Sequence, residues 1–216
     1  MILIITAVLL SYISGSFPTA ILAGRIILKD DIRNHGSRNA GATNVFRVMG
    51  WKPALVVLLV DMAKGAAAVI FISSIAANTA VISPVNAKLL CGVAAIAGHV
   101  WTVFARFKGG KGVGTAFGVL VSMAPLPAAA ALLVWLVIVL ATRIVSLGSI
   151  FAGIALAGIL FLQKYLLGAD VPVQVLAVGC ALALLILVTH RSNIRRLFAG
   201  TENKFGQKKK NGSHEN

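Results

Sequence analysis

The sequence predicts an all-α integral membrane protein, a bundle of about seven transmembrane helices built as one domain. Of its 216 residues, 58% are hydrophobic and 12% are charged, about half the charged fraction of a typical soluble domain. Apolar runs of about 18 residues or more recur, each long enough to cross a bilayer as a helix. We therefore expect one transmembrane domain over residues 1–200 and a polar, basic tail over 201–216 that is disordered toward its end.

Six apolar stretches are candidate spans: 2–23, 54–77, 86–105, 113–141, 144–163 and 171–189. The fourth contains Ala-Pro-Leu-Pro at 124–127, and two prolines there favour a break in the helix. Its halves, 113–124 and 126–141, would rise only about 18 and 24 Å, which is short for a hydrocarbon core of ~30 Å. They are either two thin or tilted spans or a re-entrant hairpin, and both arrangements return the chain to the same side.

Basic residues predict the orientation of the bundle. Seventeen Lys and Arg fall in one set of loops and the tail, whereas the opposite loops hold only Lys88 and Lys164. By the positive-inside rule the N-terminus is outside and the C-terminus is cytoplasmic. The net charge of +14 is then explained by topology and by attraction to anionic membrane lipids, so we expect no nucleic-acid partner.

Three polar segments fall on the predicted cytoplasmic face, and we expect them to build a single site between helices. They cover residues 31–50, 98–115 and 190–202. The first offers close backbone approach, short hydrogen-bonding side chains and a planar guanidinium suited to phosphate; its candidate residues are Gly36, Ser37, Asn39, Thr43, Asn44 and Arg47.

The second segment places Lys111 among Gly109, Gly110 and Gly112, ahead of a predicted helix. Exposed N–H groups in such turns form anion nests, and a helix N-terminus adds positive potential. In the third segment, His190 and Asn193 lie one helical turn apart and could face one ligand, or they could cap a helix end. The combination indicates a phosphate site.

Other site types fit the sequence poorly. The Gly-Gly-Lys-Gly run at 109–112 lacks the first glycine and the hydroxyl residue of a P-loop. No His or Cys spacing is typical of a zinc site, so we expect no metal. A transporter of phosphate or a small organophosphate stays an alternative, although we find no clear internal repeat.

Three further residues are predicted to support the site from within the bundle. Asp61 and Lys64 share one face of the second span, where intramembrane charges are costly and usually functional. We favour a mutual ion pair that stabilises the bundle over a direct catalytic role. His99 could orient the loop that carries Lys111 or form a hydrogen bond inside the bundle.

At these segments the chain resembles the bacterial acyl-phosphate:glycerol-3-phosphate acyltransferase family. The resemblance lies in SGSFP at 14–18, GSRNAGATNVFRVMG at 36–50, GH…GGKGVGT at 98–115 and HRSNIRRLFAGTE at 190–202. Two residues depart from the family's pattern. Arg38 replaces the glycine usual in GSGN, and Gly114 replaces the alanine usual in GGKGVAT.

The resemblance implies a seven-helix enzyme of the bacterial inner membrane, with both short segments crossing and the active site facing the cytoplasm. It implies that the 1-hydroxyl of glycerol 3-phosphate attacks an acyl phosphate, giving lysophosphatidic acid and phosphate in the first step of phospholipid synthesis. No cofactor or CoA is expected, and the enzyme that makes acyl phosphate is an expected functional partner.

The resemblance also implies roles for individual residues. Ser37, Arg47 and Lys111 carry the core function, and a second set supports it: Asn39, Thr43, Asn44, His190, Asn193 and Glu202. Whether Ser37 donates a hydrogen bond or acts as a nucleophile stays open. We favour the former, because no Ser–His–acid triad emerges from the sequence.

Overall fold

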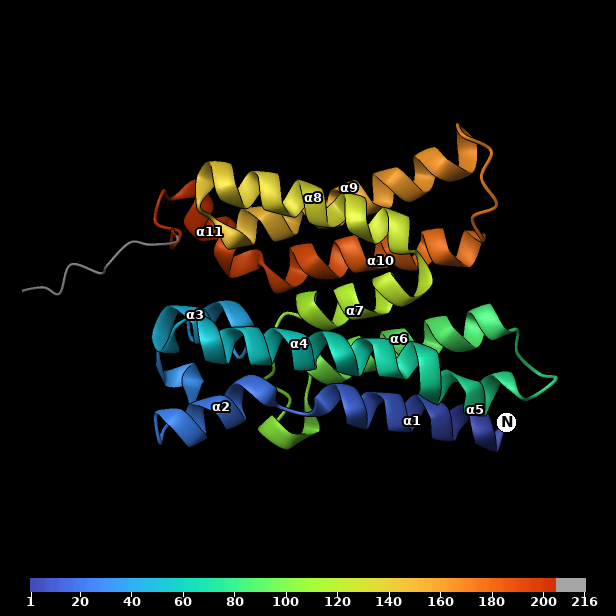
Figure 1. Ribbon diagram of the computed structural model, residues 1–216, viewed down its shortest axis with the longest axis horizontal. Helices are drawn as coiled ribbons and strands as arrows, with labels where there is room; N and C mark the ends of the chain where they lie inside the picture. The colour runs from blue at the N-terminus through green and yellow to red at the C-terminus, as the bar shows by residue number, and fades with distance from the viewer. Residues whose placement is uncertain (205–216) are drawn as a thin grey trace, which may run out of the picture.

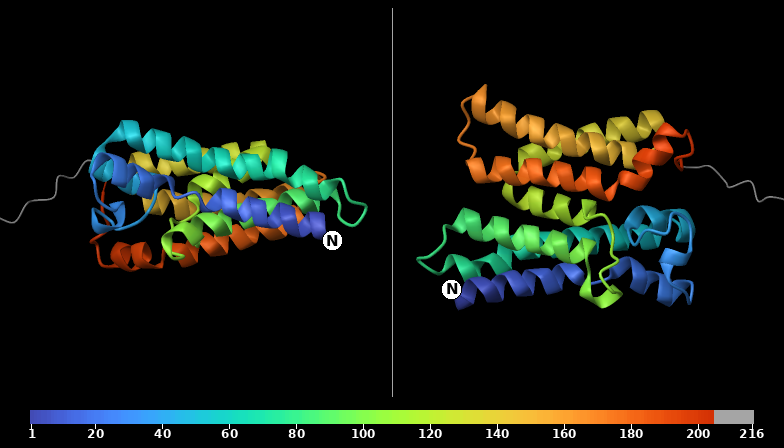
Figure 2. Two further views of the ribbon diagram at one scale, coloured as in Figure 1. Left: turned by 90° about the horizontal axis from the view of Figure 1, so that it is seen from below. Right: turned by 180° about the vertical axis from the view of Figure 1, so that it is seen from behind.

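The computed structural model describes residues 1–204, and every regular element in that part of the chain is a helix. Figure 1 shows two layers of helices with α7 (Val113–Met123) between them, and the view from behind in Figure 2 agrees. One layer contains α1 (Ile2–Ser16), α2 (Thr19–Ile27), α3 (Ala42–Met49), α4 (Trp51–Ala67), α5 (Ser73–Ala77) and α6 (Pro84–Val100). The other contains α8 (Pro125–Thr142), α9 (Val145–Tyr165), α10 (Val173–Thr189) and α11 (Arg191–Phe198). The tail predicted to be disordered lies mostly outside the described residues.

The helices confirm a multi-pass membrane protein. Five segments are long and apolar enough to cross a bilayer: Ile2–Ile27, Trp51–Ala77, Pro84–Ala105, Pro125–Thr142 and Val145–Tyr165. A sixth is added if α10 and α11, bent by 60° at His190, count as one span. The predicted break in 113–141 is confirmed, since α7 ends at Met123 and α8 begins at Pro125. With 11 residues, α7 is too short to cross by length alone, so the count of seven stays a prediction.

A buried polar cluster holds α4 against the break between α1 and α2. Lys64 Nζ lies 2.9 Å from Asp61 Oδ1, which confirms the predicted ion pair. It also donates to the Phe17 carbonyl at the break, at 3.1 Å. Thr19 Oγ1 donates to the Asp61 carboxylate at 3.2 Å, and His99 Nδ1 lies 3.5 Å from it. Each buried charge therefore has a partner of opposite charge or a hydrogen bond, as the low dielectric of the bundle requires.

Helices α4 and α7 meet along small residues, which we call the glycine seam (Gly65 and Gly118). A Cβ atom added at Gly65 would lie 2.2 Å from the Thr115 carbonyl oxygen, and one at Gly118 would lie 2.0 Å from the Met62 carbonyl oxygen. Only glycine permits such an approach, and small residues are the usual means of close helix packing in membranes. The seam places the first turn of α7 beside the second half of α4, where a Cβ added at Gly114 would lie 3.3 Å from the Asp61 Cβ atom.

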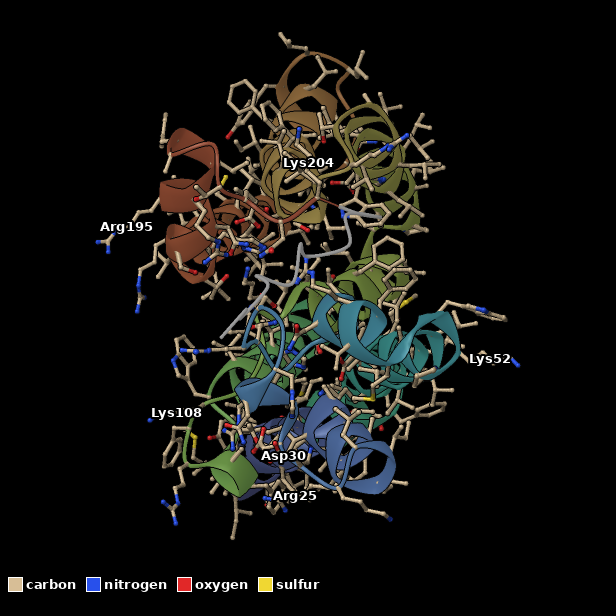
Figure 3. The ribbon with its side chains drawn as sticks, turned by 90° about the vertical axis from the view of Figure 1, so that its left-hand side faces the viewer. Arg25, Asp30, Lys52, Lys108, Arg195 and Lys204 are labelled. Carbon is tan, nitrogen blue, oxygen red and sulfur yellow. The ribbon has the colours of Figure 1, made fainter. Side chains whose placement is uncertain are left out.

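The polar segments gather toward the end of the bundle that lies opposite the N-terminus (Figure 1). Figure 3 views this end directly and shows basic side chains at its rim, among them Arg25, Lys52, Lys108 and Arg195. The turn between α5 and α6 and the turn between α9 and α10 lie at the other end. The chain therefore separates a basic polar end from an end with few charges.

Candidate functional site

A cavity of about 520 Å³ lies between the two layers and brings residues of all three polar segments together. Most of the predicted site residues line it: Ser37, Asn39, Thr43, Asn44, Arg47, Lys111, Gly112, His190, Asn193 and Glu202. Asp61 and His99 also reach it. Four predicted site residues do not line it: Gly36, Gly109, Gly110 and Lys64. Their contacts within the protein indicate supporting roles instead.

Asn44 shapes the loop that carries Ser37. It is 1% exposed, and its Oδ1 accepts the Ser37 backbone N–H at 2.8 Å. Its Nδ2 donates to the carbonyls of Ile32 and His35 at 3.1 and 3.0 Å. Both amide protons are thus used on the loop. We assign Asn44 to holding the loop rather than to binding phosphate as expected.

The glycine at position 36 serves this same loop. Gly36 has a φ of +57°, and an added Cβ would lie 2.4 Å from Asn44 Oδ1. Arg38 also adopts a left-handed φ, of +60°. That conformation costs a non-glycine residue roughly 1–2 kcal/mol. The backbone at position 38 would therefore be less strained with the glycine that is usual in the family than with this arginine.

Lys111 is held by the third polar segment. Its Nζ donates to Asn193 Oδ1, and Asn193 Nδ2 donates to Glu202 Oε1 at 2.6 Å. The same carboxylate accepts from Ser146 Oγ at 2.8 Å and Arg196 Nε at 2.6 Å. Glu202 therefore sets the direction of the Asn193 amide, which in turn places the ammonium.

Two pKa values at this site, those of Lys111 and Glu202, lie below their usual values, for different reasons. Burial lowers the pKa of Lys111 to about 8, assisted by the positive charges of Arg196 and Arg47 and opposed by Glu202. Burial alone would raise the pKa of Glu202, but hydrogen bonds from Asn193, Arg196 and Ser146 outweigh it and leave that pKa below its usual value. At neutral pH the cavity therefore presents a net positive end to an anion.

Gly109 and Gly110 pack against α6 and do not expose their N–H groups to the cavity. These groups donate to the carbonyls of Val100 and His99, at 3.0 and 3.1 Å. A Cβ at Gly110 would lie 2.2 Å from His99 Nε2. The expected anion nest is therefore wrong for these two glycines, and His99 both contacts Asp61 and supports the loop of Lys111. The free N–H groups lie instead in the first turn of α7, where Gly112 (φ +83°) and Val113 line the cavity.

His190 lies at the bend between α10 and α11 and is 3% exposed. Its Nδ1 is 2.8 Å from the Ile186 carbonyl. A carbonyl only accepts, so Nδ1 carries the proton and Nε2 is the free ring atom. His190 and Asn193 both line the cavity, as their spacing of one helical turn predicted. His190 is also the C-cap residue of α10, so the alternative role at a helix end applies to it as well.

Beyond its polar end the cavity continues along apolar side chains from both layers. These are supplied by α4, α7, α8 and α9, and include Leu58, Met62, Phe117, Leu120, Leu132 and Leu156. The cavity can therefore hold a ligand that is anionic at one end and hydrocarbon along its length. Within residues 1–204 no cluster of three or more His, Cys, Asp or Glu could hold a metal ion.

Sequence reasoning missed Ser146 and Arg196. Arg196 lies in the third polar segment, but its charge was used only to predict which side of the bundle faces the cytoplasm. Ser146 lies near the start of α9, outside all three segments, and no sequence pattern connects it with Glu202. Their common role follows only from the fold.

Comparison with known proteins identifies the family to which the chain is similar. Residues 5–200 match the family model described as glycerol-3-phosphate acyltransferase. A glycerol-3-phosphate acyltransferase of Chlorobaculum tepidum is 42% identical over 96% of this chain and 100% of its own. One of Chlorobium phaeobacteroides is also 42% identical, over 96% and 99%.

Among solved structures, the chain is similar to PlsY, an integral membrane glycerol 3-phosphate acyltransferase. The glycerol 3-phosphate form is 37% identical with a TM-score of 0.81, covering 94% of this chain and 96% of that one. The lysophosphatidic acid form is 36% identical with a TM-score of 0.78. The chain belongs to the glycerol-3-phosphate acyltransferase family.

Proposed function

We propose that this protein transfers an acyl group from an acyl phosphate to the 1-hydroxyl of glycerol 3-phosphate. The products are lysophosphatidic acid and inorganic phosphate, and the reaction uses neither CoA nor a metal ion. The observation that carries the proposal is the shape of the cavity, which joins a positively charged end to an apolar arm. An acyl phosphate has this same division, and the similar PlsY was solved with glycerol 3-phosphate and with lysophosphatidic acid.

The step needs positioning and charge stabilisation more than covalent chemistry. The 1-hydroxyl oxygen attacks the acyl carbonyl carbon, the bond from that carbon to the phosphate oxygen breaks, and phosphate leaves with the electron pair. Arg47 and Lys111 would neutralise the two anionic substrates, and the first turn of α7 would add backbone N–H groups. The proton of the hydroxyl passes to a phosphate oxygen, with Ser37 donating a hydrogen bond to the reacting groups.

The same proposal includes the orientation of the bundle. The N-terminus lies outside, α7 and α8 each cross the membrane, and the site faces the bacterial cytoplasm, where an enzyme that makes acyl phosphate would supply the donor. The basic rim at the site's end of the bundle supports this arrangement. Membership of an acyltransferase family favours the enzyme over the transporter alternative.

The test uses the purified protein in detergent micelles with palmitoyl phosphate and glycerol 3-phosphate. Lysophosphatidic acid should form, palmitoyl-CoA should not replace the acyl phosphate, and EDTA should leave the rate unchanged. Lys111→Ala, prepared identically, controls for a contaminating acyltransferase. Efficient CoA-dependent turnover, or no turnover with acyl phosphate, would overturn the proposal.

A further inference from the structure

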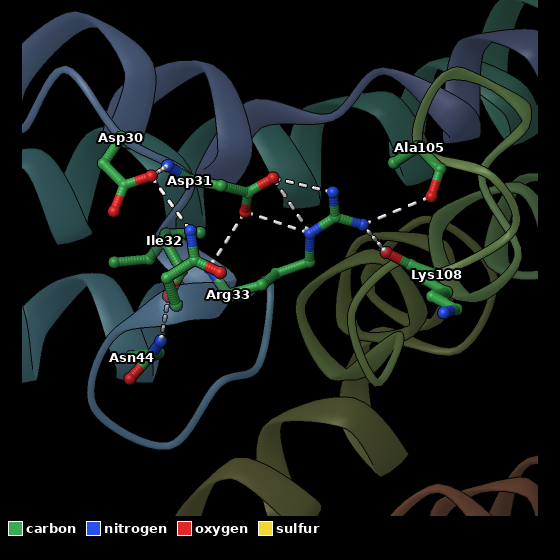
Figure 4. A network of polar contacts seen from close by, with 8 residues as sticks. Asp30, Asp31, Ile32, Arg33, Asn44, Ala105 and Lys108 are labelled. Atoms are coloured by element: carbon green, nitrogen blue, oxygen red, sulfur yellow. Dashed lines mark hydrogen bonds and ion pairs between the residues drawn. The ribbon is translucent and has the colours of Figure 1, made fainter.

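Arg33 joins the loop that carries Ser37 to the loop that leads to Lys111, as Figure 4 shows. Its Nε and Nη2 pair with the carboxylate of Asp31, at 2.9 Å for Nε–Oδ1 and 2.7 Å for Nη2–Oδ2. Its Nη1 donates to the carbonyls of Ala105 and Lys108, at 3.2 and 3.0 Å. One guanidinium thus bridges segments more than 70 residues apart in the sequence.

Each loop is held by further hydrogen bonds on its own side of this bridge. In the first, Asn44 fixes the carbonyl of Ile32, directly before Arg33, and the N–H of Ser37. In the second, the residues after Lys108 are fixed by the hydrogen bonds of Gly109 and Gly110 to α6. A continuous series of polar contacts and peptide bonds therefore runs from Ser37 through Arg33 to Lys111.

We propose that Arg33 is a positioning residue for acyl transfer, which sets the spacing between the loop of Ser37 and the loop of Lys111. The inference rests on the proposed function. Arg33 does not line the cavity, so it acts through the loops and touches no substrate. Ser37 and Lys111 come from different polar segments, so their separation depends on such a link. Displacements of about 1 Å at a reacting centre can cost 10²-fold in rate.

The contacts require a guanidinium and not merely a positive charge. The planar head holds Asp31 along one edge while its remaining nitrogen reaches two carbonyls, an arrangement that a single ammonium cannot reproduce. The side chains of Arg33 and Asp31 are 28% and 20% exposed, and partly solvated pairs contribute little to global stability. Loss of Arg33 should therefore disturb the loops without unfolding the bundle.

The experiment compares Arg33→Ala and Arg33→Lys with the parent and with Arg195→Ala, which removes an exposed arginine from the same end of the bundle. Three measurements are made on each protein: steady-state kinetics with palmitoyl phosphate and glycerol 3-phosphate, thermal stability, and hydrogen exchange of peptides covering residues 101–112. In both Arg33 variants kcat should fall about 10- to 100-fold, while each KM stays within about threefold because the substrate contacts remain. Exchange at Gly109 and Gly110 should accelerate, with the melting temperature preserved.

The outcomes separate this inference from the proposed function. A parent that makes no lysophosphatidic acid refutes the proposed function, whereas the exchange measurement still reports whether Arg33 couples the loops. Parent-like kcat or unchanged exchange in Arg33→Ala overturns the positioning role. So does a full recovery of kcat in Arg33→Lys, because charge alone would then suffice. A loss of rate that follows a fall in melting temperature would show a merely structural residue.

Discussion

The protonation of Lys111 should control the rate of acyl transfer at mildly alkaline pH. With a pKa of about 8, roughly nine tenths of the molecules carry the ammonium at pH 7 and roughly one tenth at pH 9. Phosphate groups are already ionised in this range and arginine stays charged, so neither adds a step. The initial rate of lysophosphatidic acid formation at saturating substrates should therefore fall about tenfold between pH 7 and pH 9, after subtraction of the non-enzymatic hydrolysis of acyl phosphate.

Stability changes in the opposite direction, which separates the two effects. Because the pKa of Lys111 is lower in the folded chain than its ordinary value of 10.5, the unfolded chain binds more protons between about pH 8 and 10.5, and this residue's contribution to stability rises with pH. Unfolding driven by Lys111 cannot then mimic the loss of rate.

Two variants complete this test. Lys111→Ala should lose roughly 10²–10³ in kcat, the usual cost of one stabilising donor, together with the tenfold alkaline decline. Lys108→Ala removes an exposed ammonium three residues away, leaves the carbonyl that Arg33 uses, and should retain the parent's pH profile. A parent rate that stays flat to pH 9.5, or an Lys111→Ala variant with the same alkaline decline, would refute the assignment.

The remaining predictions concern the bundle and its orientation. Lys64→Met leaves the buried Asp61 carboxylate without its ammonium partner. The free energy of unfolding, measured by denaturant titration in micelles, should fall by about 3–5 kcal/mol. Adding Asp61→Asn should recover most of this loss, and a Lys64→Met variant as stable as the parent would contradict the pairing. Arg38→Gly should raise the same free energy by about 1 kcal/mol by relieving the left-handed φ, and a loss would show an unseen contact. In a Cys-free background, a cysteine at Asn78 should react with an impermeant reagent outside intact cells, whereas one at Ser213 should not; the reverse would invert the topology.

Features of the fold that depend on length and local spacing were predictable from the sequence. The apolar stretches located the helices, the prolines near residue 125 located the break after α7, and the i,i+3 spacing of Asp61 and Lys64 located their pair. Each of these follows from helix geometry within one segment. The gathering of three polar segments at one end was predictable for the same reason, since alternate ends of successive spans share a face.

Contacts between residues that are far apart in the sequence were not predictable. Gly109 and Gly110 were predicted to face a ligand, yet they pack against the turn of α6 that contains His99. No pattern in the sequence distinguishes the two faces of a loop. Asn44 read as a ligand group although its amide is used within its own loop. Arg33 and Arg196 read as basic residues that set topology, because a guanidinium in a polar loop looks the same whether it faces water or a buried acceptor.

The glycine seam has a consequence for how this sequence can vary. Where α4 and α7 touch, the backbone of one helix occupies the space that any side chain on the other would need. Large apolar residues such as Leu133 and Leu140 instead point away from the bundle and are 61% and 71% exposed. The lipid chains around them are fluid and can pack against side chains of many shapes. In a library of all single substitutions, the lipid-facing positions should accept most apolar residues, whereas Gly65 and Gly118 should accept almost none. The smallest side chains in the protein are thus expected to be among its least replaceable.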